Sequence, residues 1–449
     1  MSTITIAPAP TPTAPPMQKE TTAGSYFISN YPPFSFWKSD SIPQFQEALE
    51  RAPEPGNDLG LYTHIPFCRK RCHFCYFKVY TDKDAAAIRG YIDAVLKELT
   101  AYASKPVIGG RKPRFLYFGG GTPSYLSESQ LKFLSDSMKA LLPWDAAEEI
   151  TFEAEPGTLT DHKLKAIRDM GVTRLSLGIE HFDDHILEIN GRAHRSKEII
   201  RAYNYAREIG FPQVNIDLIA GMVEETEEKW RETVAKAVAL QPDSVTIYQM
   251  EVPYNTGIYQ RMKAEGKLVA PVADWDVKRR WVQYAYGEFE KVGYTVTSAT
   301  TVVRDPAKVK FVYREGLFSS ADILSVGVAS FGRLNGVHYQ NQHEFEPYLA
   351  AVNKGELPVY RAYVPPADER LIREFILHFK LGRNSVSHFQ KKFGVNVLER
   401  FAAPLQRLKD WGFLTIEGDT LKLNREGLLE VDRLLHEFFL PQHLTNRTT

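Results

Sequence analysis

The stretch YTHIPFCRKRCHFCYF, residues 62–77, holds all three cysteines of the 449-residue chain. Cys68, Cys72 and Cys75 follow the spacing C-x₃-C-x₂-C. Iron–sulfur clusters are held by closely spaced thiolates, which usually number four. Three thiolates would leave one iron of a [4Fe–4S] cluster without a protein ligand, and metal sites keep such a position to bind and activate another molecule. The spacing therefore predicts a [4Fe–4S] cluster with one open iron.

Two other interpretations of these cysteines, a disulfide and a zinc site, compete with the cluster. A disulfide with one free thiol would suit a secreted protein, but no charged segment followed by an apolar core begins the chain. Zinc is the stronger alternative, because Cys₃His sites exist and His64 and His73 lie nearby. No second C-x₂-C or H-x₃-H half-site follows, so the cluster is favoured and zinc stays as the alternative.

The motif Tyr-x-His-Ile-Pro-Phe-Cys, which starts at Tyr62, resembles the radical S-adenosylmethionine (SAM) superfamily. Within it, the chain resembles the oxygen-independent coproporphyrinogen III oxidase (dehydrogenase) family over roughly residues 27–440. That family also contains heme chaperones and a class of radical SAM methyltransferases. The resemblance implies that Cys68, Cys72 and Cys75 hold the cluster and that its open iron binds SAM.

Composition describes an ordinary globular chain. Equal numbers of basic and acidic residues leave no net field that would attract nucleic acid. The longest apolar runs, such as Leu324–Ala329, are far shorter than the roughly 18–20 residues of a membrane span. We therefore expect no nucleic-acid partner and no membrane span. Few cysteines and an oxygen-sensitive cluster suit a reducing cytoplasm, and we expect a monomer.

The pattern of the chain predicts five segments. Residues 1–23 include an Ala/Pro/Thr-rich run and are expected to be a disordered tail. An N-terminal extension (24–58) precedes a barrel core (59–260), and residues 261–364 extend the barrel towards the substrate and a second SAM. Residues 365–449 form a C-terminal, mostly helical domain.

Short apolar runs alternate with amphipathic stretches across the predicted core. This rhythm is typical of parallel βαβ units, and six strands suggest a partial (β/α)₆ barrel, the fold that the resemblance also implies. The loops after the strands carry the chemistry in such folds. The expected strands are Leu61–Thr63, Phe115–Phe118, Ile150–Phe152, Arg174–Leu177, Val214–Leu218 and Val245–Tyr248. The expected helices are Ala85–Tyr102, Ser127–Leu142, Asp161–Met170, Lys197–Ile209 and Glu227–Leu240.

The C-terminal pattern predicts the helices Arg370–Leu381, Val386–Phe393 and Val397–Trp411, followed by a hairpin over Phe413–Leu423. Helices and a hairpin in this order resemble a winged helix. No basic cluster dominates the region, which argues against DNA binding. We expect a lid over the active site, as the family resemblance implies.

The resemblance assigns most candidate SAM contacts to loops that follow strands. Tyr62 precedes the cluster loop, and Phe74 lies within it, between Cys72 and Cys75. Glu180 stands where the family usually has glutamine, and Glu155 is placed in the same pocket as the SAM contacts. The remaining implied contacts are Gly120, Gly121, Thr122, Glu153, Arg192 and Asp217.

The resemblance is weaker at the substrate site. Glu251 and Phe331 fall where the oxidases contact a second SAM molecule. The oxidases usually have a fourth cysteine two residues after the third, and Phe77 stands there, as is more typical of the chaperones and methyltransferases. The segment Gly336–Gln342 favours the oxidases.

The expected function is radical SAM chemistry on a tetrapyrrole. The family resemblance implies that a 5′-deoxyadenosyl radical abstracts hydrogen from propionate side chains of coproporphyrinogen III, and that CO₂ loss gives the vinyl groups of protoporphyrinogen IX. A flavodoxin- or ferredoxin-type protein would supply the electron. The alternatives are a methyltransferase or other C–C-bond-forming enzyme of the same family, and a heme chaperone.

Overall fold

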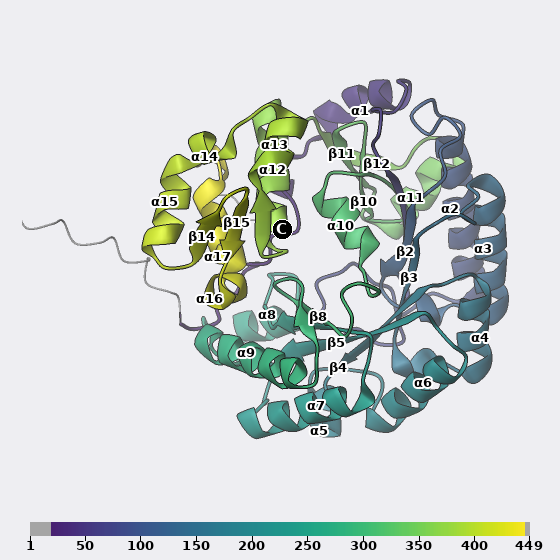
Figure 1. Ribbon diagram of the computed structural model, residues 1–449. Coiled ribbons are helices and arrows are strands. Elements are labelled where there is room, and N and C mark those ends of the chain that lie inside the picture. The colour runs from purple at the N-terminus through teal and green to yellow at the C-terminus, as the bar shows by residue number, and fades with distance from the viewer. Residues whose placement is uncertain (1–18, 445–449) are drawn as a thin grey trace, which may run out of the picture.

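The computed structural model describes residues 19–444, and a curved, open sheet of twelve strands forms its centre (Figure 1). Six parallel strands lie side by side in chain order, which confirms the predicted partial barrel. They are β1 (Leu59–Ile65), β2 (Phe115–Gly120), β3 (Glu149–Ala154), β4 (Arg174–Glu180), β5 (Gln213–Ala220) and β6 (Ser244–Gln249).

Helices that connect these strands cover the outer side of the arc (Figure 1). They are α2 (Ala85–Ala103), α3 (Glu128–Leu141), α4 (Asp161–Asp169), α5 (Asp184–Ile189), α6 (Ser196–Glu208) and α7 (Glu227–Leu240). Several begin after a residue whose side-chain oxygen accepts a backbone N–H of the first turn, among them Asp84, Ser127, Thr160 and Thr226. Such caps satisfy amide groups that have no partner inside the helix.

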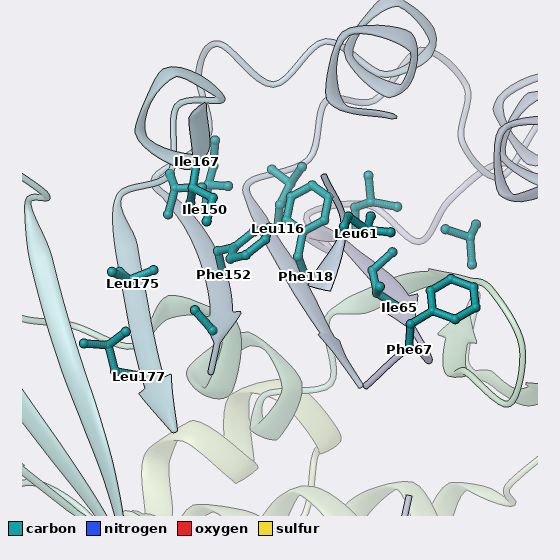
Figure 2. Packing of buried hydrophobic residues seen from close by; sticks show 14 of the residues in the cluster. Leu61, Ile65, Phe67, Leu116, Phe118, Ile150, Phe152, Ile167, Leu175 and Leu177 are labelled. Atoms are coloured by element: carbon teal, nitrogen blue, oxygen red, sulfur yellow. The ribbon is translucent and has the colours of Figure 1, made fainter. Parts of the chain in front are cut away.

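Alternation along the strands separates a hydrophobic face from a polar face. Leu116, Phe118, Phe152, Leu175 and Leu177 are buried in the main hydrophobic core between sheet and helices, as Figure 2 shows. Successive residues of a strand point to opposite faces, so the intervening residues face the inside of the arc. Many of those are polar, so the concave side of the sheet can bind polar ligands.

Both edges of the sheet carry further strands. On the β1 side lie β9 (Asp322–Val326), β10 (Phe331–Leu334), β11 (Val337–Asn341) and β12 (Val359–Tyr363). On the β6 side lie β8 (Thr301–Val303) and β7 (Thr295–Val296). β9 runs parallel to β1, whereas β10, β11 and β12 pair antiparallel. Helices α1 (Ile42–Leu49), α8 (Gly257–Ala264), α9 (Trp275–Lys291), α10 (Val312–Phe318) and α11 (Phe345–Asn353) complete this part.

The C-terminal domain lies across the open side of the arc (Figure 1) and has its own hydrophobic core around Phe375. Its helices are α12 (Ala367–Phe379), α13 (Val386–Phe393), α14 (Val397–Arg400), α15 (Ala402–Asp410), α16 (Arg425–Leu429) and α17 (Val431–Leu435). The strands β13 (Arg383–Ser385), β14 (Leu414–Glu417) and β15 (Thr420–Leu423) form a small sheet that includes the expected hairpin.

One predicted helix, Val397–Trp411, is divided in the structure. The break lies at Phe401, whose backbone is not helical (φ −114°, ψ 26°). Pro404 follows in the first turn of α15, and a proline lacks the N–H that a continuous helix would need there. Proline is tolerated in a first turn, so the chain starts a new helix.

Of the predicted N-terminal tail, residues 1–23, the part up to residue 18 lies outside the described residues. The remainder packs on the barrel instead of forming part of a tail, because Thr21 is fully buried and its carbonyl accepts a hydrogen bond from the Ala270 N–H (2.9 Å). Over residues 19–444, no helix has the length and apolar character that crossing a bilayer requires.

Candidate active site

The cysteine loop leaves the C-terminal end of β1 and is closed at its base by backbone hydrogen bonds. Tyr80 N–H donates to the Pro66 carbonyl (2.7 Å), and Cys68 N–H donates to the Tyr80 carbonyl (3.1 Å). All three cysteines line a cavity of about 590 Å³, whose opposite wall comes from the C-terminal domain around Leu429–Arg433. The loop is therefore a fixed platform at one end of a partly covered cavity.

Most of the predicted site residues line this same cavity. Tyr62 and Phe331 are the exceptions. The predicted residues at the cavity are Cys68, Cys72, Phe74, Cys75, Gly120, Gly121, Thr122, Glu153, Glu155, Glu180, Arg192, Asp217 and Glu251.

The environment of the thiols favours a bound cluster. The Thr122 hydroxyl donates to Cys68 Sγ and the Arg192 guanidinium to Cys72 Sγ, both at 3.2 Å. Burial raises the pKa of Cys68 to about 12 and that of Cys75 to about 11. These buried thiols keep their protons until a positively charged metal replaces them, since metal ligation requires the thiolate.

The spacing of the sulfur atoms disfavours zinc. Ligand atoms on a tetrahedral zinc lie about 4 Å apart, given Zn–S distances of about 2.3 Å. Throughout residues 19–444, the only three potential ligands with donor atoms all within 4.8 Å of one another are Glu374, His378 and His388. Among residues 19–444, the three cysteine sulfurs therefore do not form so compact a group.

The glycine turn after β2 packs directly against the cysteine loop. A side-chain carbon on Gly120 would lie 2.5 Å from the His64 ring, and one on Gly121 would lie 2.9 Å from the Ile65 carbonyl. Gly120 also has a φ of +112°, which favours glycine. The His64 ring in turn shares a hydrogen bond with the Tyr62 hydroxyl (3.0 Å). Tyr62 therefore supports the loop from behind through His64.

Three carboxyl groups, the buried Glu180 and the half-buried Glu153 and Asp217, form what we call the acidic floor of the cavity. Burial, together with repulsion from neighbouring acids, raises the pKa of Glu153 and of Glu180 to about 7 each, and burial raises the pKa of Asp217. A cationic ligand would offset both the burial of these carboxylates and their mutual repulsion. SAM carries an ammonium and a sulfonium group, so the floor fits it.

Hydrogen bonds hold the acidic floor in place. Glu153 accepts from the Tyr117 hydroxyl (2.5 Å) and from the Gly120 N–H (3.2 Å). Asp217 accepts from the Ser176 hydroxyl (3.1 Å) and the Asn215 amide (2.9 Å). These partners lie on the inner faces of neighbouring strands, so the alternation of the strands positions both carboxyl groups.

Arg192 lies between the cysteines and the acidic floor. Its guanidinium is 3.5 Å from the Glu180 carboxylate and donates to the Gly178 carbonyl (2.5 Å). Its Nε is buried without a hydrogen-bond partner. Glu180 has a φ of +67°, rare for a residue other than glycine. An unsatisfied donor beside the cysteines fits the carboxylate of SAM.

Glu155 differs from the acidic floor in its partners. It accepts from Arg69 (3.2 Å) and is hydrogen-bonded to His194 (2.9 Å). Although burial opposes ionisation, His194 and the nearby Arg192 and Arg69 lower the pKa of Glu155 to about 2. Its charge is already compensated, so Glu155 anchors the cysteine loop through Arg69.

The two residues predicted to contact a second SAM lie apart. Glu251 lines the cavity and accepts from the Tyr26 N–H (3.0 Å), and burial raises its pKa to about 7. Phe331 lies outside the cavity lining, packs against Phe34 and Trp37, and is 39% exposed. The structure therefore does not bring Phe331 and Glu251 to one site.

Aromatic residues that sequence reasoning did not assign also line the cavity. Tyr76, Phe77 and Tyr248 are 40–45% exposed although they are large, and the rings of Tyr76 and Phe77 stack at 4.5 Å. Large apolar side chains exposed together mark a binding surface. Their positions directly after Cys75 and at the end of β6 are the sequence features that could have indicated a role in binding.

Comparisons with known proteins agree with this geometry. The radical SAM superfamily model matches residues 62–237, and the HemN C-terminal domain model matches residues 366–429. The solved structure of coproporphyrinogen III oxidase (HemN) from Escherichia coli, described as a radical SAM enzyme, has a TM-score of 0.79 to this chain at 25% identity. That match covers 93% of this chain and 99% of the other.

Two kinds of curated relative are similar over most of their length. Oxygen-independent coproporphyrinogen III oxidase of Escherichia coli (strain K12) is 26% identical over 430 residues, 93% of this chain and 89% of the relative. Heme chaperone HemW of Bacillus subtilis (strain 168) is 27% identical over 370 residues, 82% of this chain and 96% of the relative. Domains, fold and cysteine loop agree: the chain contains a radical SAM domain, of the superfamily that binds a [4Fe–4S] cluster and SAM, and a HemN C-terminal domain, and it is similar to HemN over most of its length.

Proposed function

We propose that this protein catalyses the oxygen-independent oxidative decarboxylation of coproporphyrinogen III to protoporphyrinogen IX. The observation that carries the proposal is a single cavity in which the three cysteines and the acidic floor meet a wall of aromatic and cationic side chains. The similarity to coproporphyrinogen III oxidase over 93% of the chain, C-terminal domain included, supports it.

Different residues of this chain would bind the cluster and SAM. Cys68, Cys72 and Cys75 would hold the cluster, and Thr122 and Arg192 donate hydrogen bonds to two of their sulfurs. Cluster and SAM, when bound, supply the radical that abstracts hydrogen from the substrate. The acidic floor would bind the cationic groups of SAM, and Arg192 its carboxylate.

The substrate would lie against the aromatic and cationic side chains that line the cavity. Tyr76, Phe77 and Tyr248 offer flat apolar surface to a tetrapyrrole. Arg279 of α9 and Arg433 of α17 line the same cavity, and guanidinium groups bind carboxylates such as propionates well. Because Arg433 belongs to the C-terminal domain, this domain both binds substrate and excludes water.

A heme chaperone is the second candidate function. Phe77 replaces the fourth cysteine typical of the oxidases, and a heme chaperone is among the relatives of similar identity. A chaperone would hold heme against the same aromatic wall without turnover. The two functions differ in whether SAM is consumed together with a porphyrinogen.

The test is an anaerobic reaction with reconstituted protein, SAM, a reductant and coproporphyrinogen III, followed by mass spectrometry. We expect two successive losses of CO₂ with two hydrogens each, and no product from Cys72→Ala. Phe331→Leu, which changes a residue outside the cavity, is the matched control and should keep the activity.

Other outcomes would replace the proposal. Formation of 5′-deoxyadenosine with unchanged porphyrinogen would reject this substrate. A methylated product with S-adenosylhomocysteine would identify a methyltransferase. Stable heme binding that leaves SAM intact would identify the chaperone.

The setting of the reaction is part of the same proposal. We place the enzyme in the cytoplasm as a monomer, reduced by a flavodoxin- or ferredoxin-type protein. Arg69, Lys70 and Arg71 give the cysteine loop three consecutive positive charges, which would attract an acidic electron donor. Reduction rates that fall steeply with ionic strength would support such docking.

A further inference from the structure

A second cavity of about 410 Å³ lies at the other end of the barrel strands. It is lined by residues just before β1 and β2, among them Asn57 and Arg114, by α10, and by Arg370 and Arg373 of α12. The cysteine loop and the glycine turn follow the C-terminal ends of β1 and β2, so this cavity is separate from the candidate active site.

Most of the acidic residues around this second cavity already have a cationic partner. Three carboxylates form ion pairs with three of its basic side chains, and Glu315 is exposed to water, where its charge is screened. The pairs are Asp58–Arg114 (2.6 Å), Glu54–Arg370 (3.2 Å) and Glu374–Lys392 (2.8 Å).

Two buried arginines remain without an acidic partner. Arg333 and Arg373 are 6% and 3% exposed, and no described carboxylate lies within ion-pair distance of either. Asp322 is near Arg333 but pairs with Arg111 (2.8 Å). Burial lowers the pKa of both guanidinium groups, and the charge of Arg333 lowers that of Arg373 further, to about 9, although Asp322 near Arg333 and Glu374 near Arg373 offset part of this effect.

The contacts that the two arginines do make are to neutral groups. Arg333 donates to the Ser320 and Ala321 carbonyls. Arg373 donates to the Asn30 side-chain oxygen (2.7 Å), the Leu317 carbonyl (3.2 Å) and the Ser320 hydroxyl (3.1 Å). Carbonyl oxygens at the end of a short helix offset only part of a full charge. Two adjacent buried cations without an anion are costly, so the cavity carries uncompensated positive charge.

His338 adds an unsatisfied group to the same cavity. It is 2% exposed, and its Nε2 is buried with no hydrogen-bond partner among the described residues. Trp37 stacks on the ring at 5.2 Å and fixes its orientation. A buried ring nitrogen that lacks a partner is the kind of exception that a missing ligand explains.

We propose that this cavity binds a phosphate-type dianion, with Arg333 and Arg373 as its ligands and His338 beside them. Two guanidinium groups match two negative charges, and their planar forks suit the oxygens of a phosphoryl group. Because Arg333 lies on β10 and Arg373 on α12, the anion would bridge the barrel and the C-terminal domain. The inference does not depend on the reaction at the cysteines.

The test measures the thermal unfolding temperature of the full-length protein in inorganic phosphate and in sodium chloride of equal ionic strength. A ligand that binds only the folded state raises this temperature in a concentration-dependent way. We expect a saturable rise in phosphate alone, lost in Arg373→Gln and in Arg333→Gln. Arg400→Gln, which removes an arginine paired with Asp368 outside the cavity, should keep the rise.

A second measurement keeps the test decisive if an arginine variant fails to fold. Calorimetric titration of the wild-type protein with inorganic phosphate and with glycerol 3-phosphate separates free phosphate from a phosphomonoester as the natural ligand. Binding of either, weakened in His338→Phe, supports the site. Absence of heat with both probes, or equal stabilisation by chloride, would overturn it.

Discussion

The two cavities lie at opposite ends of the same strands and carry opposite excess charge. At the C-terminal ends, the acidic floor contains Glu153 and Asp217, held by neutral hydrogen-bond donors. At the N-terminal ends, Arg333 and Arg373 lie buried without acidic partners. Both arrangements are costly in the ligand-free protein.

We infer from this contrast that the uncompensated charge of each cavity is opposite in sign to the ligand that the cavity binds. The acidic floor suits the ammonium and sulfonium groups of SAM, and the paired arginines suit an anion. Other buried charges in the described part of the barrel, such as Asp322 and Glu155, have partners in the chain itself. We propose that the acidic floor and the two arginines bind ligands, whereas Asp322 and Glu155 stabilise the fold.

The largest effect is expected at the cysteines. Cys72→Ala should abolish cluster binding, because only two thiolates would remain, and with it the brown colour and the absorbance at roughly 400 nm. Iron and sulfide analysis after anaerobic reconstitution measures the loss. Phe77→Ala changes a neighbouring residue that is not a ligand and should keep full iron content.

Replacing Arg192, the proposed partner of the SAM carboxylate, tests the proposed SAM site. Arg192→Gln should weaken SAM binding by about 30- to 100-fold, or roughly 2–3 kcal/mol, because a buried charge-assisted contact is lost. Equilibrium dialysis of reconstituted protein gives the dissociation constant. Arg89→Gln, at an exposed position of α2 outside the cavity, is the control, and equal weakening in both variants would contradict the assignment.

The acidic floor also predicts how SAM binding depends on pH. The pKa of Glu153 and of Glu180 is about 7 in the ligand-free protein, so a cationic ligand must displace protons below that pH. Affinity should fall as pH drops from 8 to 5, by about tenfold per pH unit for each proton displaced. A flat profile would show that the floor does not contact the cationic groups.

A smaller effect concerns the stability of the ligand-free protein. The pKa of Glu153 is raised in the folded state, so folding loses stability as pH rises from about 4.5 to 7. Glu153→Gln removes the buried charge and should stabilise the ligand-free protein at pH 8 by up to about 3 kcal/mol, but not at pH 5. Denaturant unfolding at both pH values measures this, and destabilisation at pH 8 would contradict the account.

Much of the barrel could be predicted from the sequence because its signals are local. Alternating runs identified β1 to β6, and capping residues such as Ser127 and Thr226 explain why the helices begin where they do. The break at Phe401 was missed because the apolar pattern continues across it. The hairpin of β10 and β11 turns at Asn335-Gly336, a local hairpin signal that the predicted elements did not include. β12 pairs with β11 across the intervening helix α11, and no local pattern indicates that pairing.

The candidate sites divide in the same way. The cysteine spacing is a local signal, and the contacts inferred by resemblance, except Tyr62 and Phe331, line one cavity. The second cavity draws Arg114, Arg333 and Arg373 from segments far apart in the chain, so no spacing indicates it. The role of Glu155 was also not visible, because its partners Arg69 and His194 come from two other loops.

The most direct test of the central claim is electron paramagnetic resonance of the reduced, reconstituted protein with and without SAM. The account predicts a [4Fe–4S] signal that changes when SAM is added, because the cavity leaves one iron open to it, and a much smaller change at the same SAM concentration in Arg192→Gln. A signal that SAM leaves unchanged, or a protein that takes up zinc instead of iron, would contradict the account.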